Sequence, residues 1–200
     1  MPAGETTVFA PAPFGFFSFW RSSGGLRRPP AATRAPTRHR FGRASRRPTM
    51  ADDATPDPAH FRALEEMYHG APCNDRLDPT LRIDTAEATV EFDVDESTHH
   101  AAGGMHGSYY FKALDDAAFF AVNSLVEDVF VLTTGFDVHL ERPMSEGTVR
   151  AEGVVVNANP NQLLASAIAE DGEGNEIARG TGRFARSRVE LDERVGYERE

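Results

Sequence analysis

Residues 99–116, HHAAGGMHGSYYFKALDD, combine several residue types that can do chemistry at close spacing. Metal binding by His99, His100 and His106 is one possibility, but HH-x5-H matches no common zinc or iron site. The run GGMHG lacks both the GxxxxGK[ST] and the GxGxxG patterns that bind phosphates. We therefore predict that this stretch forms neither a metal site nor a nucleotide loop.

A helix predicted over residues 106–126 gives the stretch another capability. Its free backbone amides begin near Gly107, and a helix start carries a partial positive charge. Such amides can stabilise a carbonyl oxygen as it becomes an oxyanion. Because Gly107 has no side chain, a substrate can approach this amide closely.

The two aspartates that end the stretch differ in their neighbours. Asp116 follows Lys112 by one helical turn, which predicts an ordinary surface ion pair. Asp115 lies between Phe111 and Phe119 on an apolar stripe, where a carboxylate is costly without a partner or a purpose. Two interpretations stay open: a structural Asp bonded to a buried backbone group, or a base whose pKa is raised by burial.

Gly107 and Asp115 are too far apart to act on one atom. Eight residues separate them, roughly 12 Å along a helix at about 1.5 Å per residue. Two copies of the helix, packed antiparallel across a two-fold axis, would bring Gly107 of one chain near Asp115 of the other. The spacing therefore predicts a homodimer with composite sites.

The elements that must position these residues follow from hydrophobic patterning. A short helix is predicted before the stretch, and a half-buried strand with a short partner strand lies between them. Four strands are predicted after it, from the segments VFVLTTGFDVHLERP, TVRAEGVVV, LLASAIAE and NEIARGTGRFARSR. Together they predict an α+β domain in which one antiparallel sheet wraps a long central helix.

The chain divides into three parts by composition. We expect residues 1–57 to be a disordered basic leader, with Met50 as the natural start, because the segment is rich in Arg and Pro. Residues 58–190 form the predicted domain, and residues 191–200 are expected to be a charged tail. The leader's apolar run FGFFSFW is too short for a membrane span and precedes its arginines, unlike a signal peptide. We expect no membrane association.

Charge and cysteine content narrow the partners and the compartment. From Met50 onward the chain has 12 basic and 30 acidic residues, and Lys112 is its only lysine. So acidic a surface argues against nucleic acid and indicates a salt-loving organism, because salt screens the repulsion. Cys73 stands alone, which excludes an internal disulfide and predicts a reducing, cytoplasmic setting. We expect it to be a small buried residue.

The motif HAAGGMHGSYYFKALDD, with H-G-[GS] at a helix start and an acid nine residues on, resembles PaaI-type hotdog-fold acyl-CoA thioesterases. The resemblance covers roughly residues 58–190. It implies the hotdog fold, a helix-start amide at Gly107 and a catalytic acid at Asp115. The family's motif His falls on His106, for which capping or packing at the helix start is favoured over direct chemistry.

The resemblance also implies supporting roles. His100 stands where relatives carry Asn or Gln, and is expected to help polarise the thioester carbonyl. Thr133 is expected to orient water, while Asp115 activates that water as a general base or attacks the carbonyl itself; both routes stay open. Expected substrate contacts are Ser108, Phe111, Phe119, Arg142 and Arg183, with Arg186 and Arg188 as further candidates for CoA phosphates.

These observations predict an acyl-CoA thioesterase without cofactor or metal, working as a dimer or dimer of dimers. A non-catalytic acyl-CoA-binding module on the same scaffold is the alternative from another class. A carboxylate on an apolar stripe favours the enzyme, because a binder gains nothing from its cost. A hotdog hydratase or dehydratase is disfavoured, since its His–Glu or Asp–His arrangement is not apparent.

Overall fold

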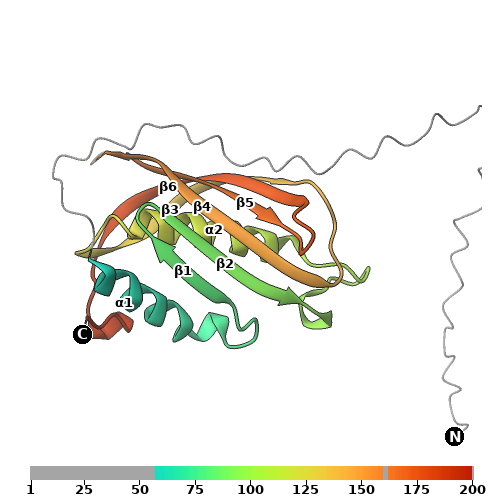
Figure 1. Ribbon diagram of the computed structural model, residues 1–200, viewed down its shortest axis with the longest axis horizontal. Coiled ribbons are helices and arrows are strands. Elements are labelled where there is room, and N and C mark those ends of the chain that lie inside the picture. Colours follow the sequence, from blue (N-terminus) through green and yellow to red (C-terminus); the bar gives the residue numbers. More distant parts are fainter. Residues whose placement is uncertain (1–56, 160–161, 200) are drawn as a thin grey trace, which may run out of the picture. The chain divides into compact units, whose positions relative to one another are not determined.

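The computed structural model describes residues 57–159 and 162–199. The predicted leader, Met50 included, lies outside the described residues except for Asp57. The described residues form two α-helices, six strands and three short 3-10 helices (Figure 1). In chain order these are α1 (Pro58–His69), η1 (Pro72–Asn74), β1 (Thr80–Asp84), β2 (Glu87–Val94), η2 (Glu96–Thr98), α2 (Gly107–Asn123), β3 (Val129–Leu140), β4 (Gly147–Asn159), β5 (Gln162–Glu170), β6 (Glu176–Glu190) and η3 (Glu193–Val195).

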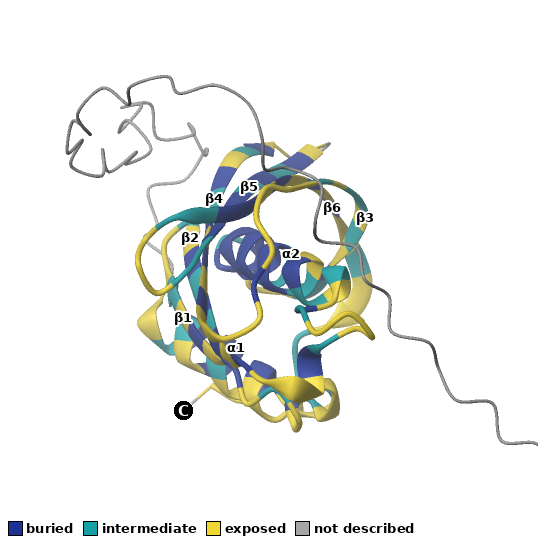
Figure 2. Ribbon diagram, turned by 90° about the vertical axis from the view of Figure 1, so that its right-hand side faces the viewer, coloured by how far each residue is buried: buried dark blue, intermediate teal, exposed yellow. Residues whose placement is uncertain are grey.

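All six strands belong to one antiparallel sheet, with the order β1-β2-β4-β5-β6-β3. The sheet curls around α2, whose buried side faces the strands (Figure 2). Strand residues alternate between this concave face and the outer face, as the pattern of buried and exposed positions on β5 shows. The predicted α+β architecture, one sheet wrapped around a central helix, is confirmed.

Small residues let the sheet approach α2 closely. An ideal Cβ placed on Gly153 of β4 would lie 2.2 Å from the carbonyl oxygen of Ala117, a distance that real Cβ atoms do not reach. Ala113, Ala117 and Ala121 recur at four-residue spacing on α2 and are all fully buried. Backbone-to-backbone packing of this kind fixes the helix within the curve of the sheet.

The helix α1 is attached to α2 by two side-chain hydrogen bonds. Tyr68 donates its hydroxyl hydrogen to Asp116, 2.8 Å away, and His60 Nε2 donates to the carbonyl oxygen of Asn123 at 2.9 Å. Residues 191–199, expected as a charged tail, fold back onto this region. Tyr197 is buried there and lies 2.7 Å from His60 Nδ1.

The strand β3 is an edge of the sheet. Among the described residues it pairs with β6 alone, which leaves its other edge unpaired over 12 residues. Leu132 and Leu140 on this strand are about half exposed. A long unpaired edge with exposed apolar side chains favours pairing with another chain.

Two further expectations concern exposure and the membrane. Cys73 is exposed in η1 rather than buried, and its thiol lies 3.7 Å from Asn74 Oδ1. Within the described residues, no helix is both long enough and apolar enough to cross a membrane.

Candidate active site

A seam between α2 and β3 contains half of the predicted site residues. Residues one turn apart on α2 each meet a residue of β3, and four such contacts follow one another. The pairs are Gly107 with Leu140, Phe111 with Phe136, Asp115 with Thr133, and Phe119 with Phe130. The helix positions ascend while the strand positions descend, so β3 runs antiparallel to α2 along the seam.

A β-bulge keeps two of these strand residues on the same face. Thr133 and Phe136 are three positions apart, which in a regular strand would place them on opposite faces. The register of β3 against β6 shifts between Thr133 and Gly135, so one extra residue is accommodated there. Both side chains therefore meet α2, and Asp115 lies between two aromatic contacts.

The carboxyl of Asp115 is partly buried and accepts a hydrogen bond from the Thr133 hydroxyl at 2.9 Å. Burial raises the pKa of Asp115 to about 6, while the Thr133 hydroxyl and the Lys112 charge oppose the rise. The hydrogen-bond donor to Asp115 is thus a side-chain hydroxyl. The interpretation of Asp115 as a purely structural residue had expected a buried backbone group instead. A carboxyl with such a pKa can exchange a proton near neutral pH.

The neighbouring Asp116 is held differently. Its Oδ2 accepts hydrogen bonds from Lys112 Nζ at 2.7 Å and from the Tyr68 hydroxyl at 2.8 Å. The side chains of Lys112 and Asp116 are 23% and 18% exposed, so the expected surface pair is largely enclosed. The expectation was wrong on this point because α1 brings Tyr68 over the pair. Asp116 therefore has two side-chain donors, where Asp115 beside it has one.

The loop before α2 forms a tight turn that orients His100. His100 and Gly104 are joined by a backbone hydrogen bond of 2.9 Å, and Gly103 adopts a positive φ of 79°. His100 Nδ1 accepts a hydrogen bond from the amide of Ala102 at 3.1 Å, so the proton of the neutral ring lies on Nε2. Nε2 is thus a hydrogen-bond donor on an exposed ring, as polarisation of a carbonyl requires.

His106 and Ser108 interact with each other at the start of α2. His106 is the N-cap, and its Nδ1 accepts from the Ser108 amide at 3.1 Å and from the Ser108 hydroxyl at 2.9 Å. The Gly107 amide lies between them at the start of the helix. Among the described residues, no group of three His, Cys, Asp or Glu is placed to hold a metal ion.

The remaining expected substrate contacts are dispersed. Phe119 is only 9% exposed and packs in the core, whereas Phe111 is 40% exposed on the seam. Arg142 is exposed near the start of α2, where its carbonyl oxygen accepts the Tyr110 hydroxyl at 3.1 Å. Arg183 points to the outer face of the sheet and pairs with Asp137 at 3.4 Å, so it does not join Asp115.

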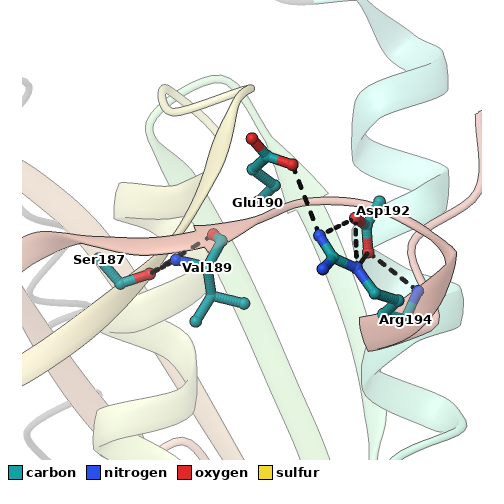
Figure 3. A network of polar contacts seen from close by, with 5 residues as sticks. All are labelled: Ser187, Val189, Glu190, Asp192 and Arg194. Atoms are coloured by element: carbon teal, nitrogen blue, oxygen red, sulfur yellow. Dashed lines mark hydrogen bonds and ion pairs between the residues drawn. The ribbon is translucent and has the colours of Figure 1, made fainter.

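The end of β6 contains the other arginines considered for CoA phosphates. Arg186 is paired with Asp128. Beyond it, Arg194 is held by Glu190 and Asp192, and the Ser187 hydroxyl accepts from the Val189 amide (Figure 3). A surface hollow here is lined by Arg188, Val189, Glu190, Asp192, Arg194 and Val195. Its two carboxylates make it a poor phosphate site.

One buried residue escaped sequence analysis. Asn123 at the end of α2 has no solvent exposure. Its side chain donates to the Val126 carbonyl at 2.8 Å and accepts from the Val131 amide at 3.2 Å. Val131 lies two residues before Thr133. Asn123 therefore fixes the start of β3 relative to α2 close to Thr133. The sequence signal for this role was a single amide side chain at the end of the otherwise apolar run AAFFAVN.

Known proteins resemble this chain in sequence and in fold. The family model described as Thioesterase superfamily matches residues 102–178. A relative from Saccharolobus solfataricus, named an esterase only provisionally, is 25% identical over 101 residues, which cover 50% of this chain and 67% of the relative.

Solved structures show the same arrangement of helix and sheet. The Escherichia coli PaaI protein from the phenylacetic acid degradation operon matches with a TM-score of 0.60 at 18% identity, over 66% of this chain and 96% of that one. A PaaI variant from Thermus thermophilus matches with a TM-score of 0.54 at 23% identity, over 58% of this chain and 100% of that one. The predicted hotdog fold and the resemblance to PaaI-type proteins are confirmed.

Proposed function

We propose that this hotdog-fold chain, which matches the thioesterase superfamily model over residues 102–178, is an acyl-CoA thioesterase that hydrolyses a thioester to a free acid and CoA. The observation that carries the proposal is Asp115. Its carboxyl has a pKa raised to about 6, lies on an apolar seam, and has the Thr133 hydroxyl beside it. Burying a carboxylate is costly, and catalysis accounts for that cost.

A second copy of the chain completes the proposed site. The unpaired edge of β3 and the exposed Phe111 support association along the seam, because a two-fold axis there would extend the sheet and cover apolar surface. Antiparallel α2 helices would then bring Gly107 of one copy to Asp115 of the other. Further association into a dimer of dimers belongs to the same proposal.

The chemistry follows from these positions. The thioester carbonyl oxygen accepts hydrogen bonds from the Gly107 amide and His100 Nε2. Asp115 of the other copy removes a proton from water, whose oxygen attacks the carbonyl carbon, and the C–S bond breaks as the thiolate takes that proton. In the second route, Asp115 attacks the carbon itself, the C–S bond breaks to release the thiolate, and an anhydride forms; water then hydrolyses the anhydride to the free acid and the Asp115 carboxylate, and the proton set free protonates the thiolate.

Thr133 has a defined part in either route. Its hydroxyl hydrogen is donated to Asp115, so the lone pairs of its oxygen can accept a hydrogen bond from water. A water held in this way lies beside the carboxylate that activates it. Thr133 thereby positions both the carboxylate and the nucleophile.

The test is thiol release from short, medium and aromatic acyl-CoAs, in low salt and in molar salt. We expect wild-type protein to hydrolyse at least one thioester, and Asp115→Asn to lose on the order of 10²-fold or more in kcat, as loss of a general base does. Asp93→Asn is the matched control, because Asp93 is exposed on β2 and contacts Thr148. Absence of hydrolysis on every thioester would contradict the function, and an unchanged rate in Asp115→Asn would contradict the site.

A further inference from the structure

The ring of Phe136 occupies space that two residues of β6 leave empty. An ideal Cβ on Gly180 would lie 2.3 Å from Phe136 Cε1. One on Gly182 would lie 2.6 Å from the Phe184 ring and 2.8 Å from Phe136 Cδ2. All three distances are shorter than real Cβ contacts, so the Phe136 ring leaves no space for a side chain at Gly180, and the Phe136 and Phe184 rings together leave none at Gly182. On its other side the Phe136 ring meets Phe111 edge-on, with centroids 5.7 Å apart and planes at 86°. Phe136 thus fills the gap between β6 and α2.

The seam on the two sides of Asp115 differs in openness. On one side Phe119 is nearly buried and contacts Phe120, Phe130 and Phe184. On the other side Phe111 is 40% exposed. The seam is therefore closed by core side chains on the Phe119 side of Asp115 and open to the surface on the Phe111 side.

The two-fold symmetry of the proposed dimer places Phe111 at its centre. If Gly107 of each copy meets Asp115 of the other, the residue midway between them lies at the axis, and that residue is Phe111. The two Phe111 rings then meet each other, each supported from behind by its own Phe136. Aromatic rings would separate the two active sites.

We propose that Phe136, braced by Phe111 and seated over Gly180 and Gly182, forms the end wall of the acyl-binding space and restricts the enzyme to short or compact acyl groups. This inference rests on the proposed thioesterase function and adds the class of acyl group. Phe136 is the residue that determines specificity, because Gly180 and Gly182 beneath it carry no side chain that could replace its ring. Its truncation leaves a gap that the rigid strand and helix cannot close.

The experiment compares kcat/KM along a straight-chain series from acetyl- to dodecanoyl-CoA for wild type and Phe136→Ala. Each additional buried methylene contributes about a factor of four. We expect wild-type kcat/KM to fall on longer chains, and Phe136→Ala to raise longer chains relative to acetyl by roughly tenfold or more. The matched control is Phe130→Ala, the same truncation on the closed side of Asp115. It should lower stability and leave the chain-length profile unchanged.

A binding measurement separates this inference from the proposed function. S-alkyl-CoA thioethers of the same lengths cannot be hydrolysed, and their affinities report the acyl space directly. If wild type hydrolyses no thioester, the function fails, while the thioether profiles still test the wall. If Phe136→Ala does not fold, Phe136→Leu removes part of the ring and should shift both profiles in the same direction. Unchanged profiles in the folded variant, or an equal shift in Phe130→Ala, would overturn the inference.

Discussion

At the scale of single residues, Asp115 and Asp116 show how one helical step separates two functions. Successive residues on an α-helix point about 100° apart, since about 3.6 residues make a turn. Asp116 therefore meets Lys112 and Tyr68, which stabilise its charge, and Asp115 faces the apolar seam with Thr133 alone. We therefore expect the Asp116 carboxylate to raise the free energy of unfolding at neutral pH and the Asp115 carboxylate to lower it.

We expect Asp115→Asn to stabilise the protein at neutral pH. The folded pKa of Asp115 is about 6, above its ordinary value of 3.8, so the folded state binds this proton more tightly and stability falls as pH rises between those values. A neutral Asn avoids that loss and can still accept from Thr133. The gain should be on the order of 1–2 kcal/mol after allowance for solvent screening, and should vanish below about pH 4.

Denaturant unfolding at several pH values measures this gain. Asp116→Asn is the control at the neighbouring position. It should lower the free energy of unfolding, because it removes the charge that accepts hydrogen bonds from Lys112 and Tyr68. A loss of stability in Asp115→Asn at neutral pH would show that the Asp115 charge is structurally useful.

The pH dependence of kcat/KM should report the same carboxyl. In the proposed mechanism Asp115 acts in its ionised form, so the acid limb of kcat/KM should lie at about pH 6. The hydrogen bond from Thr133 lowers the pKa of Asp115, so Thr133→Val should move the limb to higher pH and Thr133→Ser should restore it. An acid limb that stays in place in Thr133→Val would exclude Thr133 as the group that sets the pKa.

At the scale of elements, the stripe on the helix followed from the residues themselves, whereas only one of its strand partners, Thr133, was named in advance, through the family resemblance. Four-residue spacing placed Gly107, Phe111 and Asp115 along one stripe of α2, and local geometry suffices for that. The pairing of the stripe with β3 depends on the bulge after Thr133, which alternation alone cannot reveal. For a similar reason Arg183 falls on the outer face, since only the register of β6 decides which face it takes.

The end of α2 is secured by a buried histidine that links three segments. His60 Nε2 donates to Asn123 of α2, and its Nδ1 accepts from the hydroxyl of Tyr197. Tyr197 in turn accepts from Arg199, which pairs with Glu127 at 2.6 Å. This arrangement requires the neutral ring, because both nitrogens are already assigned.

Stability should therefore decrease as pH falls through about 6.5, the ordinary pKa of histidine. Burial lowers the pKa of His60, so the unfolded chain binds the proton more readily and acid favours unfolding in that window. His60→Gln keeps a donor and an acceptor without titrating, and its unfolding midpoint should depend less on pH there. Equal pH dependence in the variant and wild type would assign the acid sensitivity to other groups.

At the scale of the whole molecule, the acidic surface bears on the proposed association of two chains. From Met50 onward, acidic residues outnumber basic ones by 30 to 12. Several of the arginines are engaged within the chain; Arg150, for example, pairs with both Glu91 and Glu152. Two such surfaces repel each other at low ionic strength, and molar salt shortens the screening length to about 3 Å. Salt should therefore favour the proposed dimer and its activity together.

Mixing two inactive variants tests whether each active site draws on two chains. Asp115→Asn lacks the carboxylate, and Gly107→Val covers the helix-start amide with a side chain. A heterodimer of the two contains one site with both Gly107 and Asp115 intact. Subunits exchanged in low salt and returned to molar salt should thus recover about one quarter of wild-type activity, because half of the dimers are mixed and each has one working site. Light scattering verifies the dimer, and native mass spectrometry of the mixture measures the fraction of mixed dimers as the control for exchange. No recovery in exchanged dimers would mean that each site lies within one chain, against the roughly 12 Å between its two parts along α2.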